Sequence, residues 1–177
     1  MTDSITIGMR IPKDYFVTRG KGESEITIHA GSYHLALKDA GIEMCNIMTY
    51  SSIMPSIANK IERPVTLTHG AVMETIMAVA HGSNGEQATA GIIYGWLYDK
   101  KTGTKFGGLV CEHNGNYDET EVEKRLKASL NELYTNGFSE QYELKDITIL
   151  KESINTTKKH GTALVAICFV NHEIPLL

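Results

Sequence analysis

Cysteine is scarce in this chain, and its spacing argues against a disulfide framework. The chain has 177 residues and three cysteines, Cys45, Cys111 and Cys168, which stand far apart. No CxxC or HxxxC pairing occurs, so a zinc site is not expected either. Each cysteine has apolar neighbours and is predicted to be a small buried hydrophobic residue, which fits a reducing compartment.

Long hydrophobic runs and clusters of basic charge are also missing. The longest apolar run covers residues 163–170, far short of a membrane span, and residues 1–10 lack the apolar core of a signal peptide. The formal net charge of −4 argues against a protein that binds polyanions through clustered Lys and Arg. We therefore expect a cytoplasmic protein without a nucleic-acid or membrane partner.

What the chain does contain is the composition of an ordinary globular protein. Hydrophobic residues make up 42% and charged residues 21% of the sequence. A length of 177 residues is typical of one compact domain, so residues 1–177 are predicted to form a single domain.

Hydrophobic periodicity predicts about seven strands and two helices. The helices are expected at residues 29–40 and from Asp118, where Glu121 completes a capping box, to Gly137. Residues 19–24 are predicted to be a loop, and residues 81–87 a hairpin turn. The strands are expected at residues 14–18, 45–58, 72–80, 88–98, 106–113, 143–150 and 162–171.

The balance of elements predicts a fold of the α+β class. Two helices cover the outer faces of seven strands only if the strands form two sheets packed face to face, each with one helix outside. The expected architecture is therefore a four-layer αββα sandwich, and the short connections predict mainly antiparallel sheets.

The stretch CNIMTYSSIMPSIA, residues 45–58, places two adjacent serines in an apolar run. Buried hydroxyl groups need hydrogen-bond partners. If the strand is regular, Asn46 and Ser52 share a face, where an amide and a hydroxyl could hydrogen-bond each other. A local polar pair at a strand end explains the pattern equally well. Neither Ser51 nor Ser52 lies in a G-x-S-x-G motif, so no hydrolase triad is indicated.

Glu112 closes a strand that is otherwise mostly apolar. Alternation puts Phe106, Gly108, Val110 and Glu112 on one side of this strand. A carboxyl group at the end of such a run is poorly hydrated, which suits a general acid. A strand-end glutamate that leans into solvent is the alternative, and the spacing alone favours that alternative.

Four segments of the chain resemble the pyruvoyl-dependent arginine decarboxylase family. The resemblance runs in order from about Tyr15 to Val170. The matching segments are GSYHLALKDAGIEMCNIMTYSSIMP (31–55), HGAVMETIMA (69–78), GLVCEHNG (108–115) and KKHGTALVAICF (158–169).

The resemblance implies that the chain is an inactive proenzyme (zymogen) that cleaves itself. Ser52 Oγ would attack the carbonyl of Ser51, and the resulting ester would break by β-elimination. Residues 1–51 would become the β chain and residues 52–177 the α chain, with a covalent pyruvoyl group formed from Ser52 at its new end. Asn46 matches the family's asparagine that assists this autocatalytic step.

The family also implies a reaction and an assembly. The pyruvoyl group, rather than pyridoxal phosphate or a metal, would bind the substrate amine as a Schiff base and draw electrons as carbon dioxide leaves. L-arginine would yield agmatine, and Glu112 matches the family's proton donor. A small-molecule amino acid is the expected substrate, and a homotrimer or a hexamer made of two trimers, with active sites between subunits, is the expected assembly.

One position departs from the family pattern. The family helix usually carries, after an aromatic residue, an aspartate that binds the substrate guanidinium, and the matching dipeptide here is Tyr33-His34. Histidine lacks the bidentate carboxylate that a guanidinium prefers. His34 is therefore a candidate specificity residue. The alternatives are the same chemistry on a different amino acid and a non-catalytic oligomeric homologue.

Overall fold

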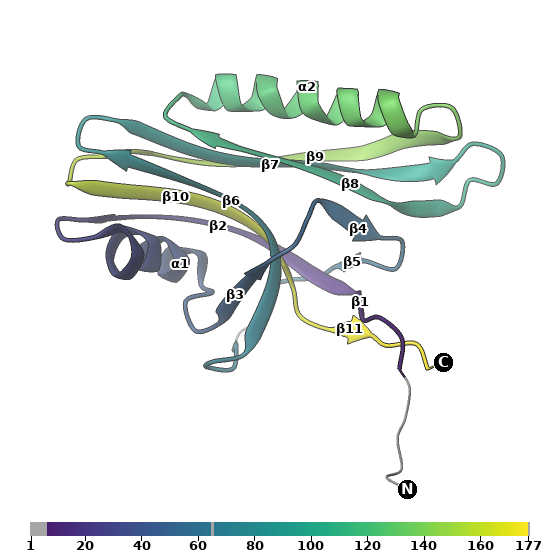
Figure 1. Ribbon diagram of the computed structural model, residues 1–177, viewed down its shortest axis with the longest axis horizontal. Coiled ribbons are helices and arrows are strands. Elements are labelled where there is room, and N and C mark those ends of the chain that lie inside the picture. The colour runs from purple at the N-terminus through teal and green to yellow at the C-terminus, as the bar shows by residue number, and fades with distance from the viewer. Residues whose placement is uncertain (1–6, 65, 177) are drawn as a thin grey trace, which may run out of the picture.

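The computed structural model describes residues 7–64 and 66–176, and this part of the chain is mostly sheet with two helical regions (Figure 1). The predicted α+β class is therefore confirmed. The elements are β1 (Ile11–Pro12), β2 (Asp14–Ser24), the π-helical turn η1 (Ile28–Tyr33), α1 (His34–Ala40), β3 (Asn46–Thr49), β4 (Ile53–Pro55), β5 (Asn59–Lys60), β6 (Val72–Ser83), β7 (Gln87–Asp99), β8 (Lys105–Gly115), α2 (Glu119–Gly137), β9 (Tyr142–Asn155), β10 (His160–Phe169) and β11 (His172–Glu173).

Two sheets hold almost all of the strands. The five-stranded sheet has the order β3-β6-β10-β2-β5, and the four-stranded sheet has the order β4-β8-β7-β9. The long strands are antiparallel throughout, and only the short β3 and β5 run parallel to their neighbours. A separate pair, β1 and β11, brings residues 11–12 beside residues 172–173.

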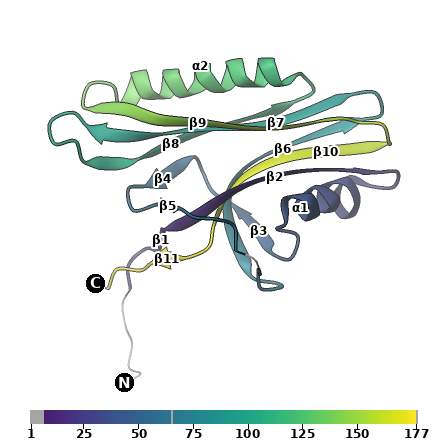
Figure 2. The same ribbon diagram turned by 180° about the vertical axis from the view of Figure 1, so that it is seen from behind.

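Helices lie on the outer faces of the two sheets. In Figures 1 and 2, α2 lies along the four-stranded sheet and α1 lies beside β2 on the opposite side of the molecule. The side chains buried between the sheets include Ile76, Ile92, Val110 and Ile167, none of which is more than 1% exposed. This apolar layer fixes the distance between the sheets, and therefore the position of every loop that crosses from one to the other.

The α2 helix begins as its sequence predicts. Asp118 accepts a hydrogen bond from Glu121 N at 2.8 Å, which satisfies one of the free amides of the first turn. Val122, Leu126 and Leu130 are buried against the four-stranded sheet. The helix therefore combines a capped start with one apolar face, which is the arrangement that tertiary packing stabilises.

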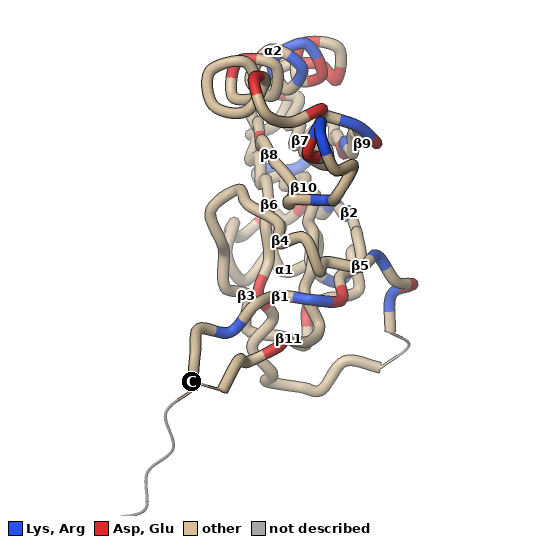
Figure 3. The backbone as a smooth tube through the Cα atoms, turned by 90° about the vertical axis from the view of Figure 1, so that its right-hand side faces the viewer, with Lys and Arg blue, Asp and Glu red and all other residues tan. Residues whose placement is uncertain are grey.

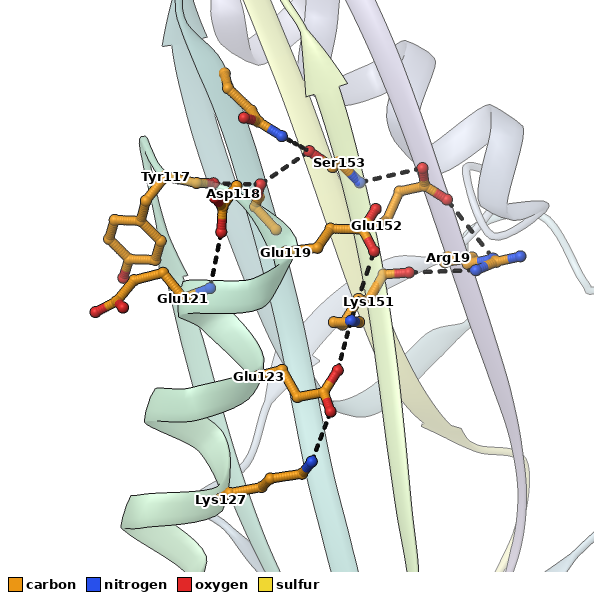
Figure 4. Close-up of polar contacts among 12 residues, drawn as sticks. Arg19, Tyr117, Asp118, Glu119, Glu121, Glu123, Lys127, Lys151, Glu152 and Ser153 are labelled. Atoms are coloured by element: carbon orange, nitrogen blue, oxygen red, sulfur yellow. Dashed lines mark hydrogen bonds and ion pairs between the residues drawn. The ribbon is translucent and has the colours of Figure 1, made fainter.

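Lysine, arginine and acidic residues occur along α2 and β9 (Figure 3), and side chains of both signs form ion pairs across this outer surface (Figure 4). Lys151 Nζ lies 2.7 Å from Glu123 Oε2 and 3.6 Å from Glu119 Oε2. Arg19 Nε on β2 lies 3.6 Å from Glu152 Oε2 on β9, so this pair links the two sheets at their edge. Ion pairs at a protein surface each stabilise a fold by only about 0–1 kcal/mol, so the apolar layer dominates.

Residues 19–24 form the second half of strand β2, so the predicted loop is wrong. The register with β10 continues to the end of the strand, where Ser24 pairs with His160. The glycines there serve close packing instead of a turn. A Cβ on Gly20 would lie 2.5 Å from Ala40 N and closer still to Ala36 O, so only glycine lets α1 approach the sheet.

Substitution of Gly20 with alanine is expected to lower the free energy of unfolding by about 3 kcal/mol, because α1 must move away from β2. Gly137→Ala is the matched control, since no atom lies within 4 Å of the Cβ position at Gly137. Chemical denaturation of both variants measures the difference. Equal stability of the two variants would contradict the close-approach explanation.

The predicted hairpin between residues 72–80 and 88–98 is also wrong. β6 pairs with β10 and β3, whereas β7 pairs with β8 and β9, so the connection at residues 84–86 crosses between the sheets. Both strands are apolar along most of their length, and each occupies an interior position in its own sheet. Two strands that follow each other in the sequence can pair as a hairpin or enter different sheets, and the sequence does not distinguish these two arrangements.

No helix in the described ranges, 7–64 and 66–176, is long and apolar enough to cross a membrane.

Candidate active site

The serine-rich stretch at residues 45–58 crosses from one sheet to the other. β3 pairs with β6 of the five-stranded sheet, and β4 pairs with β8 of the four-stranded sheet. The prediction of one continuous strand is therefore wrong, and Asn46 and Ser52 do not share a strand face. Apolar residues alone do not reveal such a crossing, because they occur along the whole stretch, whereas burial changes from half-buried Ile47 in β3 to buried Met54 in β4.

Backbone hydrogen bonds hold the crossing on both sides. Tyr50 N donates to Thr75 O on β6 at 2.7 Å. Val110 N on β8 donates to Ser52 O at 3.2 Å. Ser51, which is exposed, lies between these two anchors and spans the gap between the sheets.

The carbonyl oxygen of Ser51 carries a hydrogen bond of its own. Ile53 N donates to Ser51 O at 2.9 Å, which closes a three-residue turn with Ser52 at its centre. A donor at this oxygen withdraws electron density from the carbonyl carbon and stabilises negative charge on the oxygen. Sequence reasoning missed this donor, because a backbone amide leaves no signal in the side-chain pattern.

Ser52 and Glu112 meet although they are 60 positions apart in sequence. Ser52 Oγ lies 2.9 Å from Glu112 Oε1 and 2.8 Å from Oε2, and the hydroxyl donates its single proton to this carboxylate. Glu112 is half-buried on β8, in register with Ile92 of β7. The neighbouring Cys111 belongs to the cluster under α2, and burial raises the pKa of its thiol to about 11.

Asn46 lies at the start of β3 and uses its amide on the loop before β6. Its Nδ2 donates to Gly70 O at 2.9 Å. Within the described part of the chain, no hydrogen bond joins Asn46 to Ser51 or Ser52. The structure therefore brings Ser51, Ser52 and Glu112 together and places Asn46 at the other end of β3.

His34 lines a pocket on α1, apart from the pocket beside Ser51. It is the exposed first residue of α1 and lines a pocket of ≈ 430 Å³ with His29, Ala30, Tyr33 and Leu37. The rings of His29 and Tyr33 stack with centroids 5.8 Å apart. This pocket and the pocket beside the crossing, which Tyr50, Ser51 and Ile53 help to line, share no lining residue among the described ones.

A second, open pocket of ≈ 470 Å³ adjoins the crossing. Its lining residues are Met9, Arg10, Pro12, Tyr50, Ser51 and Ile53. The sequence contained no sign that Met9 and Arg10 approach this pocket. They reach it because β1 pairs with β11 and holds the first described segment beside the crossing.

No group of three or more His, Cys, Asp or Glu side chains within residues 7–64 and 66–176 is arranged to hold a metal ion. The polar groups around Ser52 include its hydroxyl, the Glu112 carboxylate and backbone amides. These groups suit acyl transfer and proton transfer.

Residues 14–174 match the sequence model of the pyruvoyl-dependent arginine decarboxylase family. The chain belongs to this family, whose cofactor is a covalent pyruvoyl group, and it is therefore a pyruvoyl-dependent decarboxylase by class. The resemblance inferred from the four sequence segments is confirmed.

Individual relatives match over most of their length. The chain is 34% identical to the pyruvoyl-dependent arginine decarboxylase AaxB of Chlamydia pneumoniae and 31% identical to AaxB of Chlamydia abortus, and each alignment covers 94% of both proteins. It is also 34% identical to a pyruvoyl-dependent arginine decarboxylase of Methanocella arvoryzae, over 63% of this chain and 66% of that protein.

Proposed function

We propose that this protein is a self-processing decarboxylase that converts L-arginine to agmatine and carbon dioxide. In this proposal the single domain 1–177 is cut into residues 1–51 and residues 52–177. The observation that carries the proposal is the contact of Ser52 Oγ with both oxygens of Glu112, next to a Ser51 carbonyl that already accepts a hydrogen bond from Ile53 N.

The first step is an acyl shift within the chain. Ser52 Oγ forms a bond to the carbonyl carbon of Ser51, and the bond from that carbon to Ser52 N breaks, which gives an ester. Glu112 takes the hydroxyl proton, since it already accepts the hydrogen bond, and passes it to Ser52 N, which leaves as a free amine. The Ile53 amide stabilises the oxyanion that develops on Ser51 O.

The second step separates the two chains. Loss of the Cα proton of residue 52 and cleavage of its Cβ–Oγ bond release Ser51 as a carboxylate. The dehydroalanine left at residue 52 then takes up water and loses ammonia to become the pyruvoyl group. The structure fits this precursor, because residue 52 stays anchored to β8 by the Val110 amide.

The same carboxyl group serves the decarboxylation. The pyruvoyl group supplies an electron sink for the carbanion that forms when carbon dioxide leaves. Glu112 is half-buried and lies next to residue 52. It donates the proton to the substrate α-carbon. Asn46 is proposed to assist the cleavage, as in the family pattern, and from its place at the start of β3 it would act by holding that strand to the loop at Gly70.

Arginine is proposed as the substrate because the relatives named above are arginine decarboxylases. His34 favours a second candidate, the same reaction on a different amino acid. An exposed histidine at the start of α1 does not supply the paired carboxylate oxygens that a guanidinium prefers. A non-catalytic homologue remains the alternative from another class, and it predicts an uncut chain.

We further propose that the four-layer αββα domain assembles as a homotrimer or as a dimer of trimers, a hexamer. Apolar side chains are exposed around β3 and its neighbour β6: Met44 is 42%, Met48 50% and Val72 63% exposed. Water contact at such a patch is unfavourable, so the patch is suited to a subunit interface. In such an assembly the pocket at His34 of one subunit would complete the site at Ser52 of another.

The substrate proposal is tested with the processed protein and a panel of single amino acids. Release of carbon dioxide is measured for arginine, lysine, ornithine, histidine and glutamate, and the products are identified by mass. Agmatine as the main product is the expected result. Faster turnover of another amino acid would replace arginine by the second candidate, with His34 as its contact.

A further inference from the structure

Glu74 is a buried carboxylate that the proposed chemistry does not use. It lies near the start of β6, its side chain is only 3% exposed, and it pairs in register with Met48 of β3 and Phe169 of β10. Burial of a carboxylate is costly unless other groups compensate the charge. Glu74 directly precedes Thr75, whose carbonyl accepts the hydrogen bond from Tyr50 N, so this buried charge lies next to the strand residue that anchors the crossing.

The two ends of the described chain supply the compensating groups. Arg10 forms an ion pair with Glu74 Oε1, and His172 Nε2 lies against Oε2. Arg10 immediately precedes β1, and His172 begins β11, its partner strand. Among the described residues, Oε2 accepts no hydrogen bond of regular geometry, and its contact is with His172 Nε2.

Tyr50 completes this group of side chains, which we call the Glu74 cluster: Glu74, Arg10, His172 and Tyr50. The Tyr50 hydroxyl lies 3.4 Å from His172 Nε2, and its ring packs against Phe169 with centroids 5.8 Å apart. Burial raises the pKa of Tyr50, and the nearby Glu74 carboxylate adds to that effect while Arg10 opposes it. The ring, the hydroxyl and the backbone amide of Tyr50 are thus all held.

We propose that the Glu74 cluster positions the Ser51–Ser52 peptide bond for self-cleavage. Tyr50 is the residue directly before Ser51, so holding its ring and hydroxyl holds the N-terminal side of that bond. Val110 N holds the other side through Ser52 O. With both neighbours fixed, the Ser51–Ser52 peptide bond is held in one orientation for the attack by Ser52 Oγ. This inference rests on the proposed self-cleavage.

The location of the Glu74 cluster supports a role at the proposed cleavage site between Ser51 and Ser52. Arg10 and Tyr50 line the same pocket as Ser51. Arg10 and Tyr50 belong to residues 1–51, whereas Glu74 and His172 belong to residues 52–177, so the cluster joins the two sides of the crossing before the chain is cut. A group that served only to tie the termini together would not need the residue next to Ser51.

The test is the rate of chain cleavage in Tyr50→Phe, which loses only the hydroxyl and keeps the ring on Phe169. Newly synthesised protein is followed by intact mass at a temperature well below the melting temperature of each variant. Cleavage is expected to be about tenfold slower than in the wild type, since a small displacement of reacting atoms has large effects on rate. Tyr98→Phe is the matched control, because its hydroxyl donates to Asp146 Oδ2 at 3.0 Å on another part of the surface.

Two further measurements separate positioning from stability. Glu74→Gln should slow cleavage by a similar factor, and the double variant should be no slower than the slower single variant, because both changes disturb one cluster. Hydroxylamine cleaves the ester directly. Cleavage of Tyr50→Phe should stay slow in its presence, because the slowed step is the acyl shift that forms the ester.

The outcomes are distinguishable from a failure of the proposed function. If the wild-type chain stays uncut, both the self-cleavage and the positioning role are wrong. If the wild type is cut and Tyr50→Phe is cut at the same rate, only the positioning role is wrong. Restoration of wild-type cleavage by hydroxylamine would also overturn it, since the slow step would then follow ester formation.

Discussion

Replacement of Ser52 with alanine is expected to leave one uncut chain of 19.5 kDa without decarboxylase activity. The variant lacks the hydroxyl that attacks the Ser51 carbonyl, and no other hydroxyl group contacts Glu112 in the described part of the chain. The wild type should instead give two fragments that end and begin at residues 51 and 52. Intact-mass measurement of both proteins distinguishes these results.

Ser51→Ala is the matched control for this experiment. Ser51 contributes its backbone carbonyl to the proposed cleavage, and alanine keeps that carbonyl together with its hydrogen bond from Ile53 N. The side chain of Ser51 is exposed, so its loss should not disturb the crossing. An uncut Ser51→Ala chain, or a cut Ser52→Ala chain, would contradict the assignment of the nucleophile.

Replacement of Glu112 with glutamine is expected to lower turnover per processed chain by about 10²–10⁴-fold. Glutamine can still accept a hydrogen bond from Ser52 Oγ, but it cannot take up or donate the catalytic proton. Cleavage should also be slower, because the hydroxyl loses its proton acceptor. Turnover must therefore be divided by the fraction of cleaved chains, measured by mass in the same sample.

Glu143→Gln is the control for this change. Glu143 lies on β9 with its side chain 57% exposed and paired with Lys145 Nζ at 2.9 Å, so loss of its charge should leave turnover near the wild-type value. Near-normal turnover of Glu112→Gln after this correction would show that another group donates the proton.

The sequence was sufficient for the fold class and for the main elements. The capping residues at Asp118 and Glu121 and the apolar positions of α2 are local signals, and the helix begins at Glu119 as they indicate. The apolar runs that form β7 and β10 are likewise strands. These predictions succeed because each depends on burial and hydrogen bonding within one segment.

The errors in the prediction share one physical cause. Gly20 and Gly22 resemble turn glycines, but they allow α1 to lie close to β2. Residues 72–80 and 88–98 resemble a hairpin, but they belong to different sheets. In both cases the deciding contact comes from a segment far away in the sequence, which a local pattern does not record.

Residues 45–58 show the same difference between what a local pattern predicts and what contacts between distant segments decide. From the sequence by itself came the adjacent serines, the glutamate at the end of an apolar strand and a family resemblance that linked them to one chemistry. Only the tertiary structure decided that the stretch crosses between two sheets, that Ser52 Oγ meets Glu112, and that the Ile53 amide lies on the Ser51 carbonyl. Residue identity determines which chemical groups are available. The packing of two sheets through space determines which of those groups come within bonding distance.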